Sequence, residues 1–271
     1  MFPPARAAAA LAAGAAWGLF EAQWVELNEV DVPLTELPPE LDGFRILHLS
    51  DFHLGTLSLN GRALERAVSW AEHDELDLVA LTGDLLSRQR GEGRLRDALR
   101  RLRARDGIYA ILGNHDVAVT RDPFSRPTDA SAVEEEGAVL LEDDQAAFEV
   151  GGRRVQVVGG DPRGWRQRRP ERLADPNADL RILLSHFPDV VHRLEPGVFH
   201  LVLAGHLHGG QICLPTPRGK LRLEHLRAPY WEGLHRMPAA TLHVSRGLGT
   251  SFVPFRFLAR PEATKLILRT A

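Results

Sequence analysis

Cysteine and net charge are both nearly absent from the sequence, and each absence excludes a class of protein. Cys213 is the only cysteine among 271 residues, so the chain can form neither an internal disulfide nor a cysteine-based zinc cluster. Because no disulfide can form, cysteine usage does not identify the cellular compartment. The formal net charge is -3, so no chain-wide positive charge favours binding to nucleic acid. Hydrophobic residues make up 44% of the chain, which is enough for a large core.

A hydrophobic run long enough to span a membrane is also missing. Residues 7–20 form an alanine-rich apolar run of 14 residues, whereas a spanning helix needs about 20. A run of this length suits a signal peptide, a retained anchor, an interfacial helix or an alanine-rich helix packed on the domain. We expect residues 1–27 to be a targeting or anchor segment that makes the protein membrane-associated, on a side of the membrane that the sequence leaves open.

Downstream of this run the sequence predicts a linker and one larger domain. Residues 28–43 are rich in proline and predict an extended linker. Over residues 44–271, strand-like runs alternate with amphipathic helical patterns, which predicts a mixed α/β domain with a largely parallel sheet. Residues 138–158 are strand-rich and include a Val-Gly-Gly-Arg-Arg turn, so they predict a second sheet or an antiparallel extension.

Five polar stretches each follow one of these strand-like runs. They are Asp51-Phe52-His53, Gly83-Asp84, Gly113-Asn114-His115-Asp116, Ser185-His186-Phe187 and Gly205-His206-Leu207-His208. Any one of them could be a coincidental polar turn, because the chain has 12 histidines. Ligands of open α/β sheets bind outside the carboxyl ends of the strands, so we expect all five stretches to converge on one place.

The side chains in these stretches are typical of a metal site. Carboxylate, amide oxygen and imidazole together suit Mn, Fe or Zn, and the absence of thiolate argues against a structural zinc site. The candidate ligands exceed the need of one ion: Asp51, His53, Asp84, Asn114, His186, His206 and His208. Two divalent ions about 3.5–4 Å apart, sharing one carboxylate, would use this number well.

In this order, the five stretches resemble the motifs of the calcineurin-like metallophosphoesterase superfamily. Those motifs are Asp-x-His, Gly-Asp, Gly-Asn-His-Asp/Glu, a lone His and Gly-His-x-His, and the resemblance runs from about residue 44 to the C-terminus. It implies a four-layer α/β/β/α sandwich in which two mixed central sheets are flanked by helices. It also implies that Asp84 bridges two ions. The first ion would be held by Asp51, His53, Asp84 and His208, and the second by Asp84, Asn114, His186 and His206.

The same resemblance implies a metal-dependent phosphoric ester hydrolase. A metal-bridging hydroxide would attack phosphorus in line, while the ions neutralise charge on the phosphoryl oxygens. His115 is the motif histidine left without a metal, so it would donate a proton to the leaving oxygen. Asp116 would orient His115 and keep it protonated. His48, five residues before His53 in mid-strand, is expected to be packed beneath the site, and His225 and His235 are expected nearest to the cleft.

Two later segments favour one branch of the superfamily. "GHLHGGQICLP" and "VSRGLGTSFVPFRFLARPE" look like the bacterial, membrane-associated branch, which includes phospholipid-headgroup phosphodiesterases and UDP-2,3-diacylglucosamine pyrophosphatases. The expected substrate is therefore a lipid-linked phosphodiester or pyrophosphate, and the expected role lies in lipid metabolism. A soluble nucleotide substrate and a non-catalytic metal-binding scaffold are the alternatives, although intact His115 and Asp116 count against the scaffold. The native metal pair and the oligomeric state stay open.

Two arginine-bearing segments leave a choice between a structural and a ligand-binding role. Arg246, Arg256 and Arg260, with apolar neighbours such as Phe252, could face a lipid phosphate or could belong to a core strand and its loop. Residues 163–172 are rich in arginine and are either a solvated loop or a rim that faces phosphate.

Overall fold

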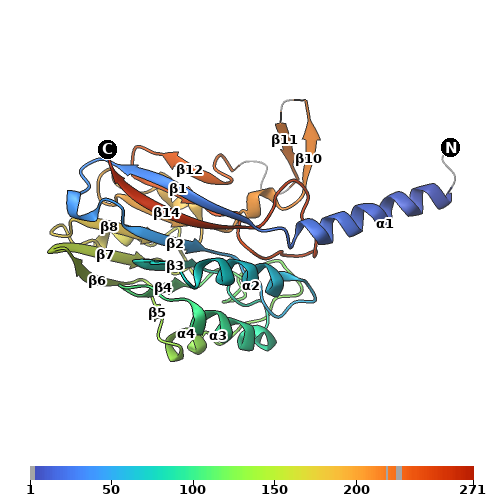
Figure 1. The fold of residues 1–271 in the computed structure, drawn as a ribbon, viewed down its shortest axis with the longest axis horizontal. Helices are drawn as coiled ribbons and strands as arrows, with labels where there is room; N and C mark the ends of the chain where they lie inside the picture. Colours follow the sequence, from blue (N-terminus) through green and yellow to red (C-terminus); the bar gives the residue numbers. More distant parts are fainter. Residues whose placement is uncertain (1–3, 218, 224–227) are drawn as a thin grey trace.

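Two six-stranded mixed sheets form the centre of the protein. The computed structural model describes residues 4–217, 219–223 and 228–271. In spatial order, the first sheet consists of β1 (Glu26–Leu34), β14 (Glu262–Thr270), β2 (Arg45–Leu49), β3 (Leu78–Thr82), β4 (Ile108–Ile111) and β5 (Val139–Leu140). The second sheet consists of β12 (Gly233–Arg236), β13 (Thr241–Val244), β9 (Leu201–Ala204), β8 (Leu180–Leu184), β7 (Arg153–Gly159) and β6 (Asp144–Val150). A separate hairpin of β10 (Cys213–Thr216) and β11 (Gly219–Arg222) stands beside them in Figure 1.

The inner faces of the two sheets share one core. Ile46 and Ala80 of the first sheet belong to the same buried cluster as Val157, Ile182 and Leu203 of the second. These side chains are buried on the inner faces of the two sheets. The strands that carry them are nearly continuous apolar runs, as expected for parallel strands that are covered on both faces. The sequence prediction of two central sheets is confirmed, and residues 138–158 supply strands to both of them.

Helices cover the outer faces of the sheets. α2 (Asn60–Ala71), α3 (Glu92–Arg101) and α4 (Ser131–Glu135) lie together along the first sheet in Figure 1, and their buried side chains join its outer cluster. The outer face of the second sheet packs against the short 3₁₀ helix η4 (Pro188–His192) and its neighbours. Other 3₁₀ turns are η1 (Pro39–Leu41), η2 (Gln89–Gly91), η3 (Pro170–Leu173) and η5 (His208–Gly210). The predicted α/β/β/α sandwich is confirmed, with a 3₁₀ helix contributing to the fourth layer.

The parallel strands bring the polar stretches to one edge. β2, β3 and β4 run parallel in the first sheet, and β7, β8, β9 and β13 run parallel in the second. Each of the five polar stretches begins one or two residues after the last residue of β2, β3, β4, β8 or β9. The strand directions therefore explain why residues far apart in sequence meet.

Part of the segment predicted as a linker belongs to the first sheet. Residues 26–34 form β1, which pairs with β14 in parallel along its whole length, and Val32 and Leu34 are buried. β1 is the edge strand of its sheet, which explains why Pro33 is tolerated there. The proline-rich composition thus marked an edge strand followed by η1 rather than a linker over all of residues 28–43.

The expected membrane association through the N-terminal apolar segment is wrong. That segment forms α1 (Pro4–Glu21), which projects from the sheets in Figure 1, and no helix in the described parts of the chain has the combined length and apolar character needed to cross a membrane. The end of α1 packs on the domain instead. Gly18 lies against the Phe257 ring, and Glu21 accepts hydrogen bonds from the Ala259 backbone and the Trp17 indole.

Candidate functional site

All seven predicted metal ligands lie together at the shared strand edge. The loops that carry them leave the sheet sharply, and five of the seven residues have a positive φ that side chains other than glycine seldom adopt. These five are Asp51 (54°), His53 (46°), Asp84 (53°), His206 (73°) and His208 (49°). Strained backbone of this kind is concentrated at functional sites, where the surrounding structure enforces it.

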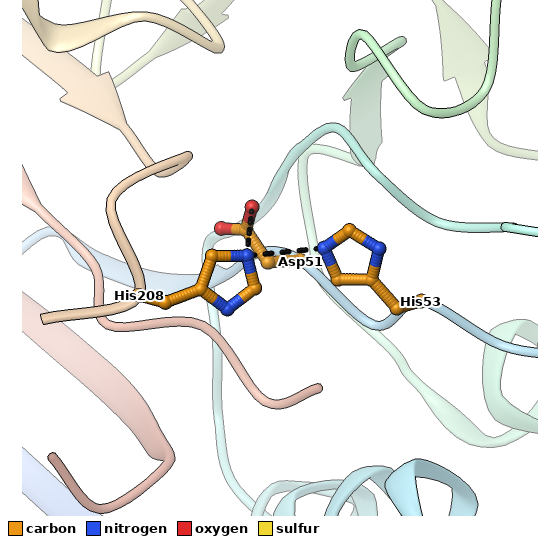
Figure 2. Close-up of side chains that lie close together, drawn as sticks. All are labelled: Asp51, His53 and His208. Carbon is orange, nitrogen blue, oxygen red and sulfur yellow. Dashed lines mark hydrogen bonds and ion pairs between the residues drawn. The ribbon is translucent and has the colours of Figure 1, made fainter. Parts of the chain in front are cut away.

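Asp51, His53 and His208 form the first donor cluster (Figure 2). One donor atom from each lies within 4.8 Å of the others. The Nε2 atoms of the two histidines face each other at 3.1 Å, and His208 Nε2 lies 3.5 Å from Asp51 Oδ1. Three side chains, carried by loops that follow strands of the two different sheets, therefore point at one small volume.

A second cluster contains Asp84, His186 and His206, with Asn114 beside it. His186 Nε2 lies 3.3 Å from Asp84 Oδ2, 3.0 Å from Asn114 Oδ1 and 3.2 Å from His206 Nδ1. The same Asp84 oxygen also lies 3.5 Å from His53 Nε2 of the first cluster. Asp84 thus stands between both clusters, where a bridging carboxylate is expected.

Two glycines allow the loops to approach each other this closely. A Cβ atom at Gly113 would collide with the Asp84 carboxylate, and one at Gly205 would collide with the Asp51 carboxylate. The backbone nitrogen of His206, next to Gly205, lies 3.1 Å from both Asp51 carboxylate oxygens and donates to them. The glycines of the motifs therefore serve contact between loops.

The two carboxylates of the site are buried without a lysine or arginine partner among the described residues. Asp51 and Asp84 are 0% and 1% exposed, and within the described residues neither forms an ion pair with Lys or Arg. Burial raises the pKa of Asp51 to about 6, with the His186 charge opposing and the Asp84 charge adding to the rise. Burial, and then repulsion from His115, lowers the pKa of His53 to about 3, so its imidazole is neutral at pH 7. Buried carboxylates beside neutral imidazoles are a donor set that fits divalent cations.

His186 behaves differently from the other buried histidines. Its burial favours the neutral ring, but the Asp84 carboxylate, together with Asp51 and the Thr82 carbonyl, outweighs burial and raises the pKa of His186 to about 9. Burial and the neighbouring His53 hold the pKa of His208 well below its usual value. The Asp84 carboxylate, which lies between the clusters, is therefore the dominant local charge. It attracts any nearby cation, whether a protonated histidine or a metal ion.

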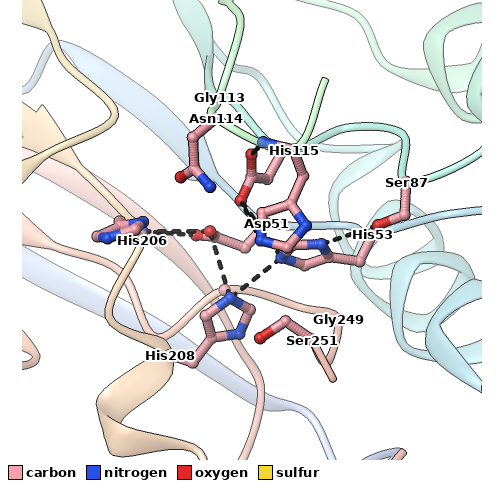
Figure 3. A network of polar contacts seen from close by, with 12 residues as sticks. Asp51, His53, Ser87, Gly113, Asn114, His115, His206, His208, Gly249 and Ser251 are labelled. Atoms are coloured by element: carbon pink, nitrogen blue, oxygen red, sulfur yellow. Dashed lines mark hydrogen bonds and ion pairs between the residues drawn. The ribbon is translucent and has the colours of Figure 1, made fainter. Parts of the chain in front are cut away.

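His115 lies beside the clusters (Figure 3), and both of its ring nitrogens have partners. Its Nδ1 is 2.6 Å from Ser125 Oγ and 3.6 Å from Asp122 Oδ2, and its Nε2 is 3.2 Å from Thr120 Oγ1. Its ring contacts that of His53 edge-on at 4.6 Å between centroids. The ring is thus held at the border of the site.

The expected role of Asp116 in orienting His115 is wrong. The Asp116 carboxylate accepts backbone hydrogen bonds from Gly113 and Leu86 at 2.8 Å and from Leu85 at 3.2 Å, so it ties two site loops together. Burial, and then repulsion from Asp84, raises the pKa of Asp116 to about 7. Asp122 and Ser125 occupy the place beside His115. Asp122 precedes a proline and so reads as an ordinary turn residue, and no signal in the sequence connected either residue with His115.

The arginines after β13 hold the backbone together. Arg246 pairs with Glu26 and Glu262, and Arg256 is fully buried and donates to backbone carbonyls, including that of Arg246 at 2.7 Å. Arg260 lies over the Trp24 ring at 3.9 Å. The structural alternative therefore holds for all three, and the lipid-phosphate alternative fails because their guanidinium groups are already engaged.

Two histidines outside the motifs, His48 and His235, have structural partners. His48 is 0% exposed and lies 2.8 Å from His243 Nδ1 and 2.9 Å from Thr82 Oγ1, so its predicted place beneath the site is confirmed. His235, on β12, bonds to the carbonyl of Glu232 at 3.0 Å. His225 lies outside the described residues.

Comparisons with known proteins agree with this geometry. The family model for calcineurin-like phosphoesterases matches residues 44–210. The metallophosphoesterase YkoQ of Bacillus subtilis is 29% identical over 245 residues, which cover 89% of each chain. The UDP-2,3-diacylglucosamine pyrophosphatase LpxG of Chlamydia trachomatis is 29% identical over 278 residues and 82% of each chain. The phosphodiesterase YaeI of Escherichia coli is 28% identical over 233 residues, 83% of this chain and 82% of that protein.

The chain therefore belongs to the calcineurin-like phosphoesterase family, and it is a metal-dependent phosphoester hydrolase. Its similarity to LpxG, YaeI and YkoQ confirms the resemblance to the bacterial branch.

Proposed function

We propose that this protein hydrolyses a phosphodiester or pyrophosphate bond of a lipid-linked substrate, using two divalent cations. The position of Asp84 carries the proposal, because one carboxylate oxygen lies 3.5 Å from a nitrogen of the first cluster and 3.3 Å from a nitrogen of the second. Asp51, His53, Asp84 and His208 would hold one cation, and Asp84, Asn114, His186 and His206 the other. The chemistry that such a pair supplies is activation of water for attack on phosphorus and neutralisation of the phosphoryl oxygens.

His115 is the proton donor to the leaving oxygen in this proposal. Asp122 and Ser125 fix its Nδ1 side, at 3.6 and 2.6 Å, so that Nε2 faces the site, 4.0 Å from Asp84 Oδ2. The protonated imidazole is the form that can give up a proton. Asp116 contributes at one remove, by holding the loop that carries His115 against the loop after β3.

A cavity next to His115 supports an apolar substituent on the leaving group. It measures about 350 Å³, and its lining includes Phe124, Phe252 and Val253, with Arg88 and Arg90 among its basic side chains. The Phe252 ring contacts His115 edge-on at 6.5 Å, so the cavity adjoins the proton donor. Apolar walls with arginines suit an acyl-bearing phosphate, and the similarity to LpxG points the same way.

The hydrolytic part is tested with bis-p-nitrophenyl phosphate and the purified, Mn-loaded protein. His115→Ala should lower kcat by roughly 10²- to 10⁴-fold, the usual contribution of a general acid, while the metal content measured by mass spectrometry stays the same. Asp84→Asn should lower the metal content itself. His73→Ala is the matched control, since this side chain is 89% exposed and should behave as wild type. Full activity of the His115→Ala variant, or an inactive Mn-loaded wild type, would contradict the proposal.

The lipid part has its own test. A diacyl pyrophosphate or phosphodiester in detergent micelles should give a higher kcat/KM than a cyclic nucleotide assayed under the same conditions. The reverse order would favour a soluble nucleotide substrate and leave the hydrolase standing. Metal binding without turnover of any phosphoester would favour the scaffold.

A further inference from the structure

A second and larger cavity borders the opposite cluster of the site. It measures about 960 Å³, and it is lined on the site's side by His206 and Phe187 and further out by Trp165, Arg166 and Arg193. The apolar cavity beside His115 has none of these residues in its wall. The two cavities therefore share no lining residue, and one adjoins the contacts of His115 whereas the other is bordered by His206.

Stacked rings lead from the site into this larger cavity. The Phe187 ring contacts His206 edge-on at 4.6 Å and stacks on Trp165 at 5.0 Å with an interplanar angle of 24°. The guanidinium of Arg166 lies over the Trp165 ring at 4.7 Å from its centroid. A basic side chain is thus connected to the candidate metal ligand His206 through two ring contacts.

Arg166 differs from three other arginines of its loop, which form ion pairs. Arg163 pairs with Asp161, Arg168 with Asp143 at 2.8 Å, and Arg169 with Glu195 at 3.8 Å. Within the described residues, the guanidinium of Arg166 forms no hydrogen bond or ion pair, and its one ring contact is with Trp165. The guanidinium of Arg193 likewise forms no hydrogen bond or ion pair there. Three arginines of the loop therefore form ion pairs within the protein, and Arg166 lines the cavity.

We infer that the larger cavity binds the part of the substrate that stays on phosphorus, and that Arg166 and Arg193 bind a second phosphate group carried by that part. This inference rests on the proposed function, because the leaving group is assigned to the side of His115. Asp189 is the one acidic side chain in the described lining, so the two arginines leave the wall with a positive formal charge. Guanidinium groups suit phosphate because their donors pair with two oxygens at once.

The inference narrows the substrate class. A simple phosphodiester carries one negative charge at the scissile phosphorus and gives the two arginines nothing to bind. A substrate with a further phosphate on the retained group can bind both arginines. Such a substrate should bind more weakly when the arginines are replaced. The arginines are therefore specificity-determining residues, acting through KM, and they take no part in the chemical step.

Two chromogenic substrates that differ in one phosphate test this directly. They are thymidine 5′-(p-nitrophenyl phosphate) and the same compound with a 3′-phosphate. For wild type, the second phosphate should raise kcat/KM about tenfold, the size of a charge-assisted hydrogen bond. In the Arg166→Ala/Arg193→Ala double variant, the ratio of kcat/KM for the two substrates should fall close to one. This fall should come from a change in KM and not from a change in kcat. Arg166→Lys should keep part of the preference.

Arg169→Ala is the matched control, because it removes a cation from the same loop. Arg169 pairs with Glu195 and does not line the cavity. It should preserve the wild-type ratio. Equal kcat/KM for both substrates in wild type, or a tenfold ratio that survives the double variant, overturns the inference, whereas wild-type turnover of bis-p-nitrophenyl phosphate reports on the hydrolase separately. If wild type turns over neither compound, calorimetric binding of thymidine 3′,5′-bisphosphate against thymidine 5′-monophosphate decides the inference alone, and equal affinity refutes it.

Discussion

Replacing Arg256 with methionine should lower the free energy of unfolding of the protein substantially. Arg256 is 0% exposed and donates to the carbonyls of Arg246 at 2.7 Å, Ala259 at 2.8 Å and Gly249 at 3.0 Å. Each buried carbonyl left without a donor costs about 1–3 kcal/mol. Removal of the buried cation works in the other direction, since burial and the nearby Arg246 lower the pKa of Arg256 to about 10. We therefore take the low end and expect a loss of about 3 kcal/mol.

Urea denaturation followed by circular dichroism measures this loss as a lower midpoint at an unchanged slope. Arg256→Lys keeps the charge and some donors, so it should lose less. Arg260→Met is the control from the same segment, because Arg260 is partly exposed and its ion pair with Glu26 is worth about 1 kcal/mol or less. The reasoning fails if Arg256→Met loses less than about 1 kcal/mol, which would mean that water or other donors satisfy these carbonyls.

Four further predictions test the rest of the site. Asp122→Asn weakens the partner of His115 and should lower kcat about tenfold at constant metal content; reduced metal content would place Asp122 with the ligands instead. Gly113→Ala puts a methyl group against Asp84 and should lower the metal content seen by mass spectrometry, so full occupancy would refute the close approach. Phe252→Ser should raise KM roughly tenfold for an acyl-bearing substrate and less for bis-p-nitrophenyl phosphate, and equal changes would argue against the apolar cavity. Mn²⁺ at 100 times its Kd should stabilise the protein by about 2.7 kcal/mol in thermal denaturation, whereas an unchanged midpoint would contradict a cation at Asp84.

The parts of the fold that the sequence predicted are those with a local signal. Runs such as 78–82 are apolar throughout and end in Gly-Asp, so both the buried strand and the polar turn are visible in the letters. The positions of the metal-type ligands at one edge followed from the direction of parallel strands. β1 was missed because an edge strand needs few buried side chains, and only Val32 and Leu34 of it are buried.

The parts that the sequence missed depend on contacts between distant segments. Asp122 and Ser125 come close to His115 only because the loop after β4 folds back across it, and nothing local requires that path. Asp116 was assigned to His115 because it is the next residue, but its carboxylate points to the backbone of the loop after β3. A neighbour in sequence was a poor guide to the neighbour in space, since adjacent side chains on a turn leave in different directions.

The backbone of the site loops explains how strained ligands are held. Five ligand residues have positive φ, and each such residue costs about 1–3 kcal/mol. The loops offset this by bonding to one another: the Asp51 amide donates to the Gly83 carbonyl, the His53 amide to the Asp84 carbonyl, and the Gly249 amide to the Asp51 carbonyl. Each bond joins two loops, so Asp51, His53 and Asp84 cannot relax without breaking a contact to a neighbouring loop. The polypeptide therefore fixes the donor geometry, and a cation gains the full attraction of Asp51 and Asp84 without first having to order the loops.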